Sequence, residues 1–147
     1  MVVVLSPQTQ DDLEARESLP RGECLRLLGD GGIGRVGLSV GSLPVILPVN
    51  YVLDGPRLVF RTGPGAKLDA AVRNAVVCVQ VDHIEPRWQS GWSVLVTGQA
   101  HRVDEEDVSD EARHRLVPWA LSAGNQYVAV PLDLLSGRRV GPVLLGT

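Results

Sequence analysis

The chain has few lysines, cysteines and aromatic residues. Its 147 residues include one lysine, Lys67, two cysteines and only 4% aromatic side chains, and every other basic residue is arginine. Two cysteines without a CxxC motif exclude a disulfide framework and a zinc-ribbon type of site. The histidines, His83, His101 and His114, stand apart without a second ligand type at metal spacing. We therefore expect no metal site.

Long hydrophobic runs and an excess of charge of one sign are also missing. The net charge of -3 is spread along the chain, so no basic field attracts a nucleic-acid backbone. The apolar residues 1–5 are too few for a signal sequence or a membrane span, and polar residues 6–16 follow them. We expect a cytoplasmic protein with reduced thiols that binds neither nucleic acid nor membranes.

The composition that is present is that of one folded domain. Hydrophobic residues make up 44% and charged residues 21% of the chain, which is typical of a globular protein long enough to bury one core. We assign residues 1–18 to an N-terminal tail and residues 19–147 to the domain.

The first half of the domain shows the periodicity of a short helix followed by strands. Pro20 and Gly29 bound a short apolar helix, and we interpret Gly31 to Gly34 as part of the helix stop. Alternating apolar residues then predict strands, with Pro48 marking an edge or a bulge and Asp54-Gly55-Pro56 a turn. The predicted strands cover residues 36–40, 45–53 and 58–62.

The second half continues with helical and strand patterns. Apolar spacing predicts a helix over 68–75, and β-branched residues apolar on both faces predict a central strand over 76–84. We then expect a loop over 86–91, a strand over 92–103 and a helix from Asp104 to about Leu116. The chain ends with strands over 126–132 and 140–145, separated by a turn at 136–139.

This order of elements predicts a mainly β fold with short helices. Hairpin-connected strands with helices between them indicate an antiparallel, barrel-like sheet and not a doubly wound fold. The glycines of 31–34 precede a strand instead of opening a helix after one, so they do not form a dinucleotide fingerprint.

One local pattern indicates an anion site. Lys67 stands in a glycine-rich turn after the strand that ends with Arg61 and Thr62, and it falls where a helix begins. Two cations, a hydroxyl and the amides of a helix N-terminus suit a phosphomonoester. Codon bias toward arginine and ordinary surface chemistry are the alternative explanations.

No other pattern supports a catalytic cluster. There is no GxSxG motif for a serine nucleophile, and Asp82 and Glu85 are more typical of solvated acids than of a paired-carboxylate mechanism. The residues alone therefore predict a ligand more clearly than a reaction.

Four segments together resemble the pyridoxamine-phosphate-oxidase-like family of flavin-binding split barrels, over roughly residues 19 to 145. They are Pro44 to Tyr51, Phe60-Arg61-Thr62, Ala66-Lys67-Leu68 and Gly91 to Gly98. They are similar, in this order, to the family's flavin-ring strand, phosphate strand, phosphate lysine and interface strand. The resemblance implies a six-stranded antiparallel split β-barrel that binds FMN, and a homodimer in which neither flavin site is complete in one chain.

The resemblance also implies which residues hold the cofactor. Arg61, Thr62 and Lys67 match the phosphate positions, and residues 46–50 match the strand whose backbone faces the ring. Ser93 stands where relatives often carry glutamine, and Trp88, Trp92 and Trp119 are candidates for the interface. The predicted cofactor-binding residues are Pro48, Val49, Asn50, Arg61, Thr62, Lys67, Trp92 and Ser93.

The resemblance favours flavin-dependent oxidation or reduction of a small organic substrate, with the chemistry carried by the cofactor. Residues 134–139 differ from the tryptophan and arginine pattern of true pyridoxamine phosphate oxidases, so we do not expect vitamin B6 oxidation. The alternatives are a deazaflavin-dependent reductase and a non-enzymatic flavin or haem carrier or sensor on the same barrel.

Overall fold

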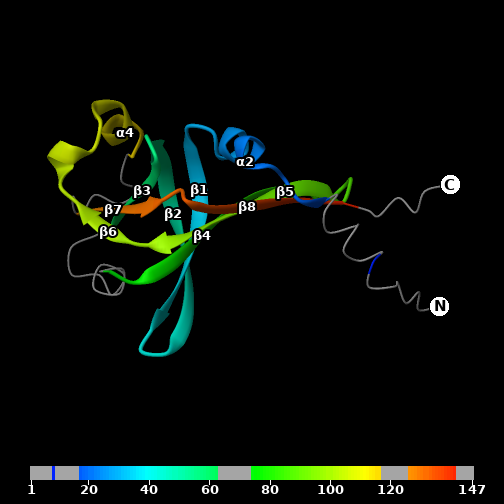
Figure 1. The fold of residues 1–147 in the computed structure, drawn as a ribbon, viewed down its shortest axis with the longest axis horizontal. Helices are drawn as coiled ribbons and strands as arrows, with labels where there is room; N and C mark the ends of the chain where they lie inside the picture. The colour runs from blue at the N-terminus through cyan, green and yellow to red at the C-terminus, as the bar shows by residue number, and fades with distance from the viewer. Residues whose placement is uncertain (1–7, 9–16, 63–73, 117–125, 142–147) are drawn as a thin grey trace.

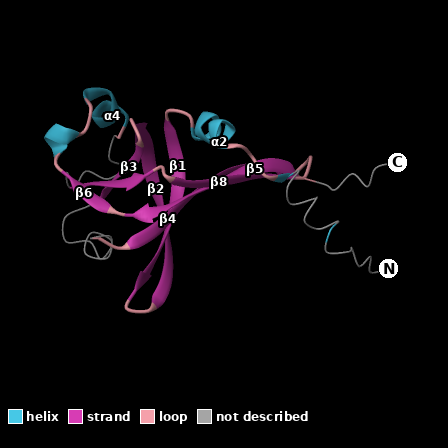
Figure 2. Ribbon diagram, in the orientation of Figure 1, coloured by secondary structure: helices cyan, strands magenta, loops and turns pink. Residues whose placement is uncertain are grey.

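One antiparallel sheet of eight strands dominates the protein (Figures 1 and 2). The structure is a computed structural model that describes residue 8 and residues 17–62, 74–116 and 126–141. The spatial order of the strands is β6-β7-β3-β2-β1-β4-β5-β8, so the sheet has two strands more than the six we expected. The strands are β1 (Gly31–Val40), β2 (Leu43–Asp54), β3 (Arg57–Thr62), β4 (Val76–Glu85), β5 (Ser90–Gln99), β6 (His101–Val103), β7 (Gln126–Pro131) and β8 (Leu134–Val140).

The sheet curls around its main hydrophobic core into a split barrel. We call the face toward this core the inner face; it carries Val36 of β1, Val79 of β4 and Val96 of β5, which are all fully buried. The inner faces of β5 and β7 meet, since a Cβ placed on Gly98 would lie 3.2 Å from a methyl of Val130. In contrast, β1 and β4 pair over three residues only, 35–37 with 78–80.

Two helices cover opposite faces of the sheet. Helix α2 (Arg21–Leu28) buries Cys24 and Leu28 against the inner side, and Gly29, with a positive φ of 60°, ends it. Helix α4 (Asp110–Arg115) lies on the outer face over β2, β3 and β7. In Figure 1 the helices α4 and α2 lie on opposite sides of β3. A second core forms there, made of Val52, Val59, Val108, Ala112, Leu116, Tyr127 and Ala129.

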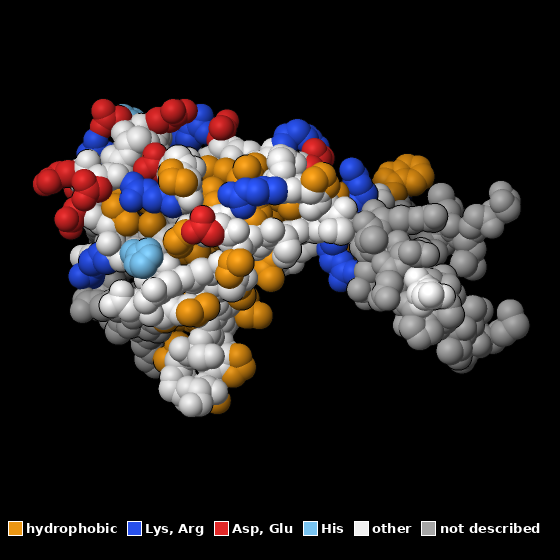
Figure 3. All heavy atoms as spheres, viewed as in Figure 1, with side chains coloured by type: hydrophobic (Ala, Val, Ile, Leu, Met, Phe, Trp, Pro, Cys, Tyr) orange, Lys and Arg blue, Asp and Glu red, His pale blue; other side chains and the backbone are white. Residues whose placement is uncertain are grey.

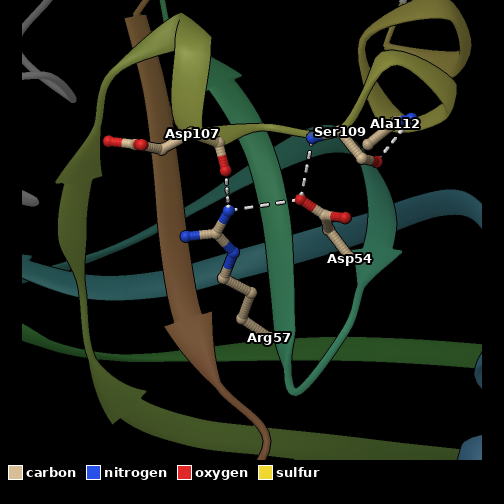
Figure 4. A network of polar contacts seen from close by, with 5 residues as sticks. All are labelled: Asp54, Arg57, Asp107, Ser109 and Ala112. Atoms are coloured by element: carbon tan, nitrogen blue, oxygen red, sulfur yellow. Dashed lines mark hydrogen bonds and ion pairs between the residues drawn. The ribbon is translucent and has the colours of Figure 1, made fainter.

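A polar network ties the β2–β3 turn to the approach to α4 (Figure 4). Arg57 Nη2 donates to Asp54 Oδ2 at 3.2 Å and also to the carbonyl of Asp107. The backbone N–H of Ser109 donates to the same carboxylate oxygen at 3.2 Å, and the Ser109 hydroxyl caps α4 by accepting from Ala112 N–H. The network holds the β2–β3 turn against the segment before α4, next to the second core.

The glycines 31–34 belong to β1, so their interpretation as a helix stop was wrong. Gly29 alone ends α2, and β1 begins at Gly31, five residues before the predicted strand. A Cβ on Gly31 would lie 2.5 Å from the Tyr51 carbonyl oxygen. Glycine is present because β1 and β2 approach closely at this point.

Three further predictions from the second half were wrong in detail. The strand predicted over 92–103 is two strands, because the chain leaves β5 at Ala100, whose N–H bonds the Ala75 carbonyl, and β6 then pairs with β7. The helix predicted over 104–116 is a 3-10 turn, η1 (Glu105–Asp107), followed by α4, because Ser109 starts a new helix. The turn predicted at 136–139 is the middle of β8, and of the strand predicted over 140–145 only Val140 is a described strand residue.

The remaining strand predictions were confirmed where the structure describes them. β2 runs through Pro48 without a break; Pro48 pairs with Arg35 of β1, whereas the described pairing with β3 starts at Tyr51. β4 is central, but Val76 and Ile84 on its other face are exposed. The helix predicted over 68–75 lies mostly outside the described residues. No helix in the described part of the chain is long and apolar enough to cross a membrane.

Candidate functional site

Three of the predicted site residues lie together on the outer face of the sheet. Residues alternate between faces along a strand, and Val49 and Tyr51 of β2 are buried on the inner face, so Pro48 and Asn50 lie on the outer face. Tyr51 pairs with Phe60, and continuing this register by one residue brings Asn50 beside Arg61 of β3. The ring strand and the phosphate strand therefore present neighbouring side chains.

The Arg61 side chain contacts Leu116 at the end of α4 and Tyr127 on β7. Its Nη1 donates to the Leu116 carbonyl at 2.8 Å, and its guanidinium lies 5.2 Å from the centroid of the Tyr127 ring. Leu116 is the C-cap of α4, and Tyr127 is the β7 residue paired with Arg61. Cation–π attraction and this hydrogen bond fix the guanidinium plane over β7.

Val49 and Thr62 face the other way. Their side chains are 6% and 4% exposed, and Val49 belongs to the main core. Val49 therefore offers a ligand on the outer face only its backbone. Thr62 is the last residue of β3, where the chain enters residues 63–73. Lys67 and its glycine-rich turn lie outside the described residues, so the phosphate turn stays a prediction.

Ser93 and Trp92 lie on a different part of the sheet, in β5. Ser93 is on the outer face, where Gln80 of β4 donates through Nε2 to Ser93 Oγ at 3.2 Å and to Asp82 Oδ2 at 2.9 Å. The preceding residue, Trp92, lies on the opposite, inner face of β5 and packs against the main core. A pocket of about 560 Å³ lies at this point, lined by Ser18, Gln80, Ser93, Leu95, Ser136, Gly137 and Arg138.

One chain does not bring all the predicted residues together. Strands β1 and β4 lie between β2 and β5, which separates Asn50 from Ser93 by about 14 Å along the sheet at the usual strand spacing. The predicted site thus divides into two groups, one on β2 and β3 and the other on β5.

A second pocket lies next to Arg61 and was missed by the sequence analysis. It has a volume of about 400 Å³ and is lined by Arg61, Glu105, Arg113, His114 and Tyr127. Arg113 forms an ion pair with Asp110, and His114 Nδ1 lies 2.6 Å from the Asp110 carbonyl oxygen. Arg113 and His114 carried no motif; only the packing of α4 on β3 and β7 places them beside Arg61.

The part of the chain that the structure describes shows no cluster of metal ligands. No three His, Cys, Asp or Glu residues there could hold a metal ion. Asp82 accepts the hydrogen bond from Gln80, and Glu85 is exposed at the start of the 86–89 turn. Binding groups, and not a paired-carboxylate site, are what the described residues bring together.

The sequence matches the family described as pyridoxamine 5'-phosphate oxidase over residues 20–139. An uncharacterized protein of Mycobacterium tuberculosis is 36% identical over 142 residues, which cover 92% of this chain and 90% of that one. Among solved structures, an FAD binding protein from Mycobacterium smegmatis is 32% identical with a TM-score of 0.72, covering 86% of this chain and 99% of its own. A conserved protein of unknown function from Corynebacterium diphtheriae is 30% identical with a TM-score of 0.64, covering 85% and 97% of the two chains.

Proposed function

The chain belongs to the pyridoxamine 5'-phosphate oxidase family, and from this premise we propose that it binds a flavin nucleotide and acts as a flavin-dependent oxidoreductase on a small organic substrate. The observation that carries the proposal is the position of Asn50 and Arg61 on one outer face of the sheet, each next to the paired residues Tyr51 and Phe60. FMN is the smallest flavin with the required phosphate. The Mycobacterium smegmatis relative is an FAD binding protein, and FAD has the same first phosphate.

The side chains present fit such a ligand. Pro48, Asn50 and the backbone of Val49 offer an exposed strand surface for a planar ring. Arg61 offers a guanidinium already oriented by Leu116 and Tyr127, and Lys67 follows in the next segment of the chain. Oriented cations bind phosphate through charge-assisted hydrogen bonds without a large ordering cost.

When bound, the flavin supplies the hydride or electron transfer. The chain's own residues bind the phosphate, orient the ring and shield one of its faces. This division of labour suits a protein whose described residues form no group of three that could hold a metal ion. Residues 134–139 form a β-strand here, and we do not propose vitamin B6 as the substrate.

We propose in addition that the protein is a homodimer, because a large apolar area lies on the outer face of the sheet. Alternation and register place seven exposed apolar side chains on this face, over β1, β2, β4, β5 and β8. They are Ile33, Ile46, Val76, Ile84, Leu95, Leu134 and Val140, with exposed fractions from 37% to 71%. Apolar areas of this extent are typical of protein interfaces. In such a dimer Ser93 of one chain completes the site of the other, whereas Trp92 packs against the main core of its own chain.

Flavin binding is tested by the colour and absorbance of the purified protein and by titration with FMN and FAD. We expect a yellow protein, or a colourless one that takes up either flavin. The same titration with a deazaflavin and with haem separates the alternative cofactors. Failure to take up any flavin would refute the proposal.

Turnover separates an enzyme from a carrier. The flavin-loaded protein is supplied with NAD(P)H and assayed with quinones and nitro compounds, and we expect oxidation of the nicotinamide. Absence of turnover across these substrates, with flavin bound, would favour the carrier or sensor.

The reducing conditions of the cytoplasm, where we place the protein, suit its two free cysteines.

Sedimentation tests the dimer. We expect twice the chain mass for the wild type, and a monomer for Ile46→Glu, since a carboxylate in an apolar interface is costly to desolvate. Trp88 is 69% exposed in the 86–89 turn and was also predicted at the interface. A wild-type monomer at micromolar concentration would contradict the dimer.

A further inference from the structure

The pocket beside Arg61 continues the proposed flavin site. Along the outer face the order is Asn50 on β2, Arg61 on β3 and Tyr127 on β7, because these strands are neighbours. The pocket lies on the far side of Arg61 from the ring strand and reaches η1 and α4. A ligand with its ring on β2 and its phosphate at Arg61 would enter this pocket if it extended further.

The pocket has a suitable size and suitable cations. Its volume of about 400 Å³ is within the range of pockets that hold small ligands. Arg113 is 34% exposed and uses Nη2 for its pair with Asp110. His114 Nδ1 lies 2.6 Å from the Asp110 carbonyl oxygen, and this contact does not use Nε2. A planar guanidinium beside a second cation suits a second phosphate.

The surroundings of these cations are acidic. Acidic side chains gather at the end of the molecule that carries η1 and α4 (Figure 3). Among the pocket residues only Glu105 is acidic, and its carboxylate opposes a bound anion. Arg61 and Arg113 line the pocket, whereas Arg115 of the same helix pairs with Asp30 and Glu111 outside it.

We propose that this pocket receives the second phosphate and the adenosine of FAD, so that the protein binds FAD more tightly than FMN. This inference rests on the proposed function, since the pocket extends a site that must first hold the ring and the first phosphate. FMN, which ends at the first phosphate, would leave the pocket without a ligand group.

Calorimetric titration of FMN and FAD against wild type and variants tests the inference. We expect FAD to bind at least about tenfold more tightly than FMN, and Arg113→Ala to remove most of this difference while FMN affinity is unchanged, since a lost charged hydrogen bond is worth about tenfold. Arg115→Ala is the matched control, because Arg115 is on the same helix, pairs with Asp30 and Glu111 and does not line the pocket. Glu105→Gln should strengthen FAD binding only.

Three outcomes would overturn the inference. Equal wild-type affinity for the two flavins contradicts it, as does an Arg113→Ala variant that weakens both flavins alike. If Arg113→Ala lowers the melting temperature, Arg113→Gln is used, and the same comparison applies. Binding of neither flavin refutes the proposed function together with this inference, whereas binding of both with equal strength refutes only the inference.

Discussion

The guanidinium of Arg61 lies over the ring of Tyr127, with 5.2 Å between the guanidinium carbon and the ring centroid. The two residues are paired across β3 and β7, and the Leu116 carbonyl accepts a hydrogen bond from the same guanidinium. A strand residue, an aromatic ring and a helix end thus position one cation before any ligand arrives.

Arg61→Lys should weaken flavin binding about tenfold, although it keeps the charge. Lysine has no planar fork, so it loses the stacking on Tyr127 and the oriented donors for phosphate. Titration of the variant with FMN measures the loss. Arg87→Lys, in the exposed 86–89 turn, is the control and should bind as the wild type does. Equal affinities of the two variants would remove Arg61 from the site.

Asp54→Asn should lower the free energy of unfolding by about 1–3 kcal/mol at pH 7, because Arg57 and the Ser109 amide lose a charged acceptor. Burial of the carboxyl raises its pKa, but the hydrogen bonds from Ser109 and Arg57 outweigh burial and hold the pKa of Asp54 below its ordinary value of 3.8. A lowered pKa stabilises the fold above the ordinary value, and the stabilisation is lost as pH falls through the folded-state pKa.

Urea unfolding at several pH values checks this prediction. The stability difference between wild type and Asp54→Asn should be constant near neutral pH and shrink below about pH 4, where the wild-type carboxylate is protonated. Asp133→Asn, in the exposed turn before β8, should have little effect at any pH. A difference that persists unchanged in acid would show that the ionised carboxylate is not what stabilises the network.

Gly137→Ala should destabilise the protein by about 1–3 kcal/mol through overpacking. A Cβ at position 137 would lie 2.5 Å from Cys24 Sγ, at the point where α2 packs on β8. Adding Cys24→Ala to the Gly137→Ala variant removes the sulfur. It should reduce the loss of unfolding free energy that the alanine at position 137 causes. Gly22→Ala, where nothing lies within 4 Å of the added carbon, should be neutral or stabilising in the same urea unfolding series. An alanine tolerated equally at both positions would contradict the close contact.

Tyr51→Phe should lower the free energy of unfolding by about 1–3 kcal/mol, because the Tyr51 hydroxyl donates to the Leu28 carbonyl at 2.7 Å in the main core. Burial raises the pKa of Tyr51 to about 12. A raised pKa stabilises the fold below the ordinary value near 10, and this contribution is lost as pH rises from there through about 12.

Absorbance at the tyrosinate band measures that titration. The chain has two tyrosines, so the difference between wild type and Tyr51→Phe isolates the Tyr51 transition, which should centre near pH 12. A difference transition near 10 would mean that the hydroxyl is open to water.

Local chemistry was enough to find most of the strands. The apolar residues at every second position from Val45 to Leu53 predicted the inner face of β2, and Val49 and Tyr51 are buried in the main core, because a half-buried strand requires that period. The glycines of 31–34 and 137 were misread as helix-stop and turn residues. Gly31 lies against the Tyr51 carbonyl and Gly137 against the Cys24 sulfur, and both partners are distant in the sequence.

By itself the sequence determined a mainly β antiparallel fold, its inner faces, and Arg61 and Lys67 as candidates for a phosphate, because periodicity and residue chemistry are local properties. Only the tertiary structure decided which side chains share a face. Strand order put Asn50 beside Arg61 but left β1 and β4 between Asn50 and Ser93, and helix packing brought Arg113 and His114 to the same pocket as Arg61. These relationships depend on the register between distant strands and on helix docking, which are set by burial of the two cores as a whole.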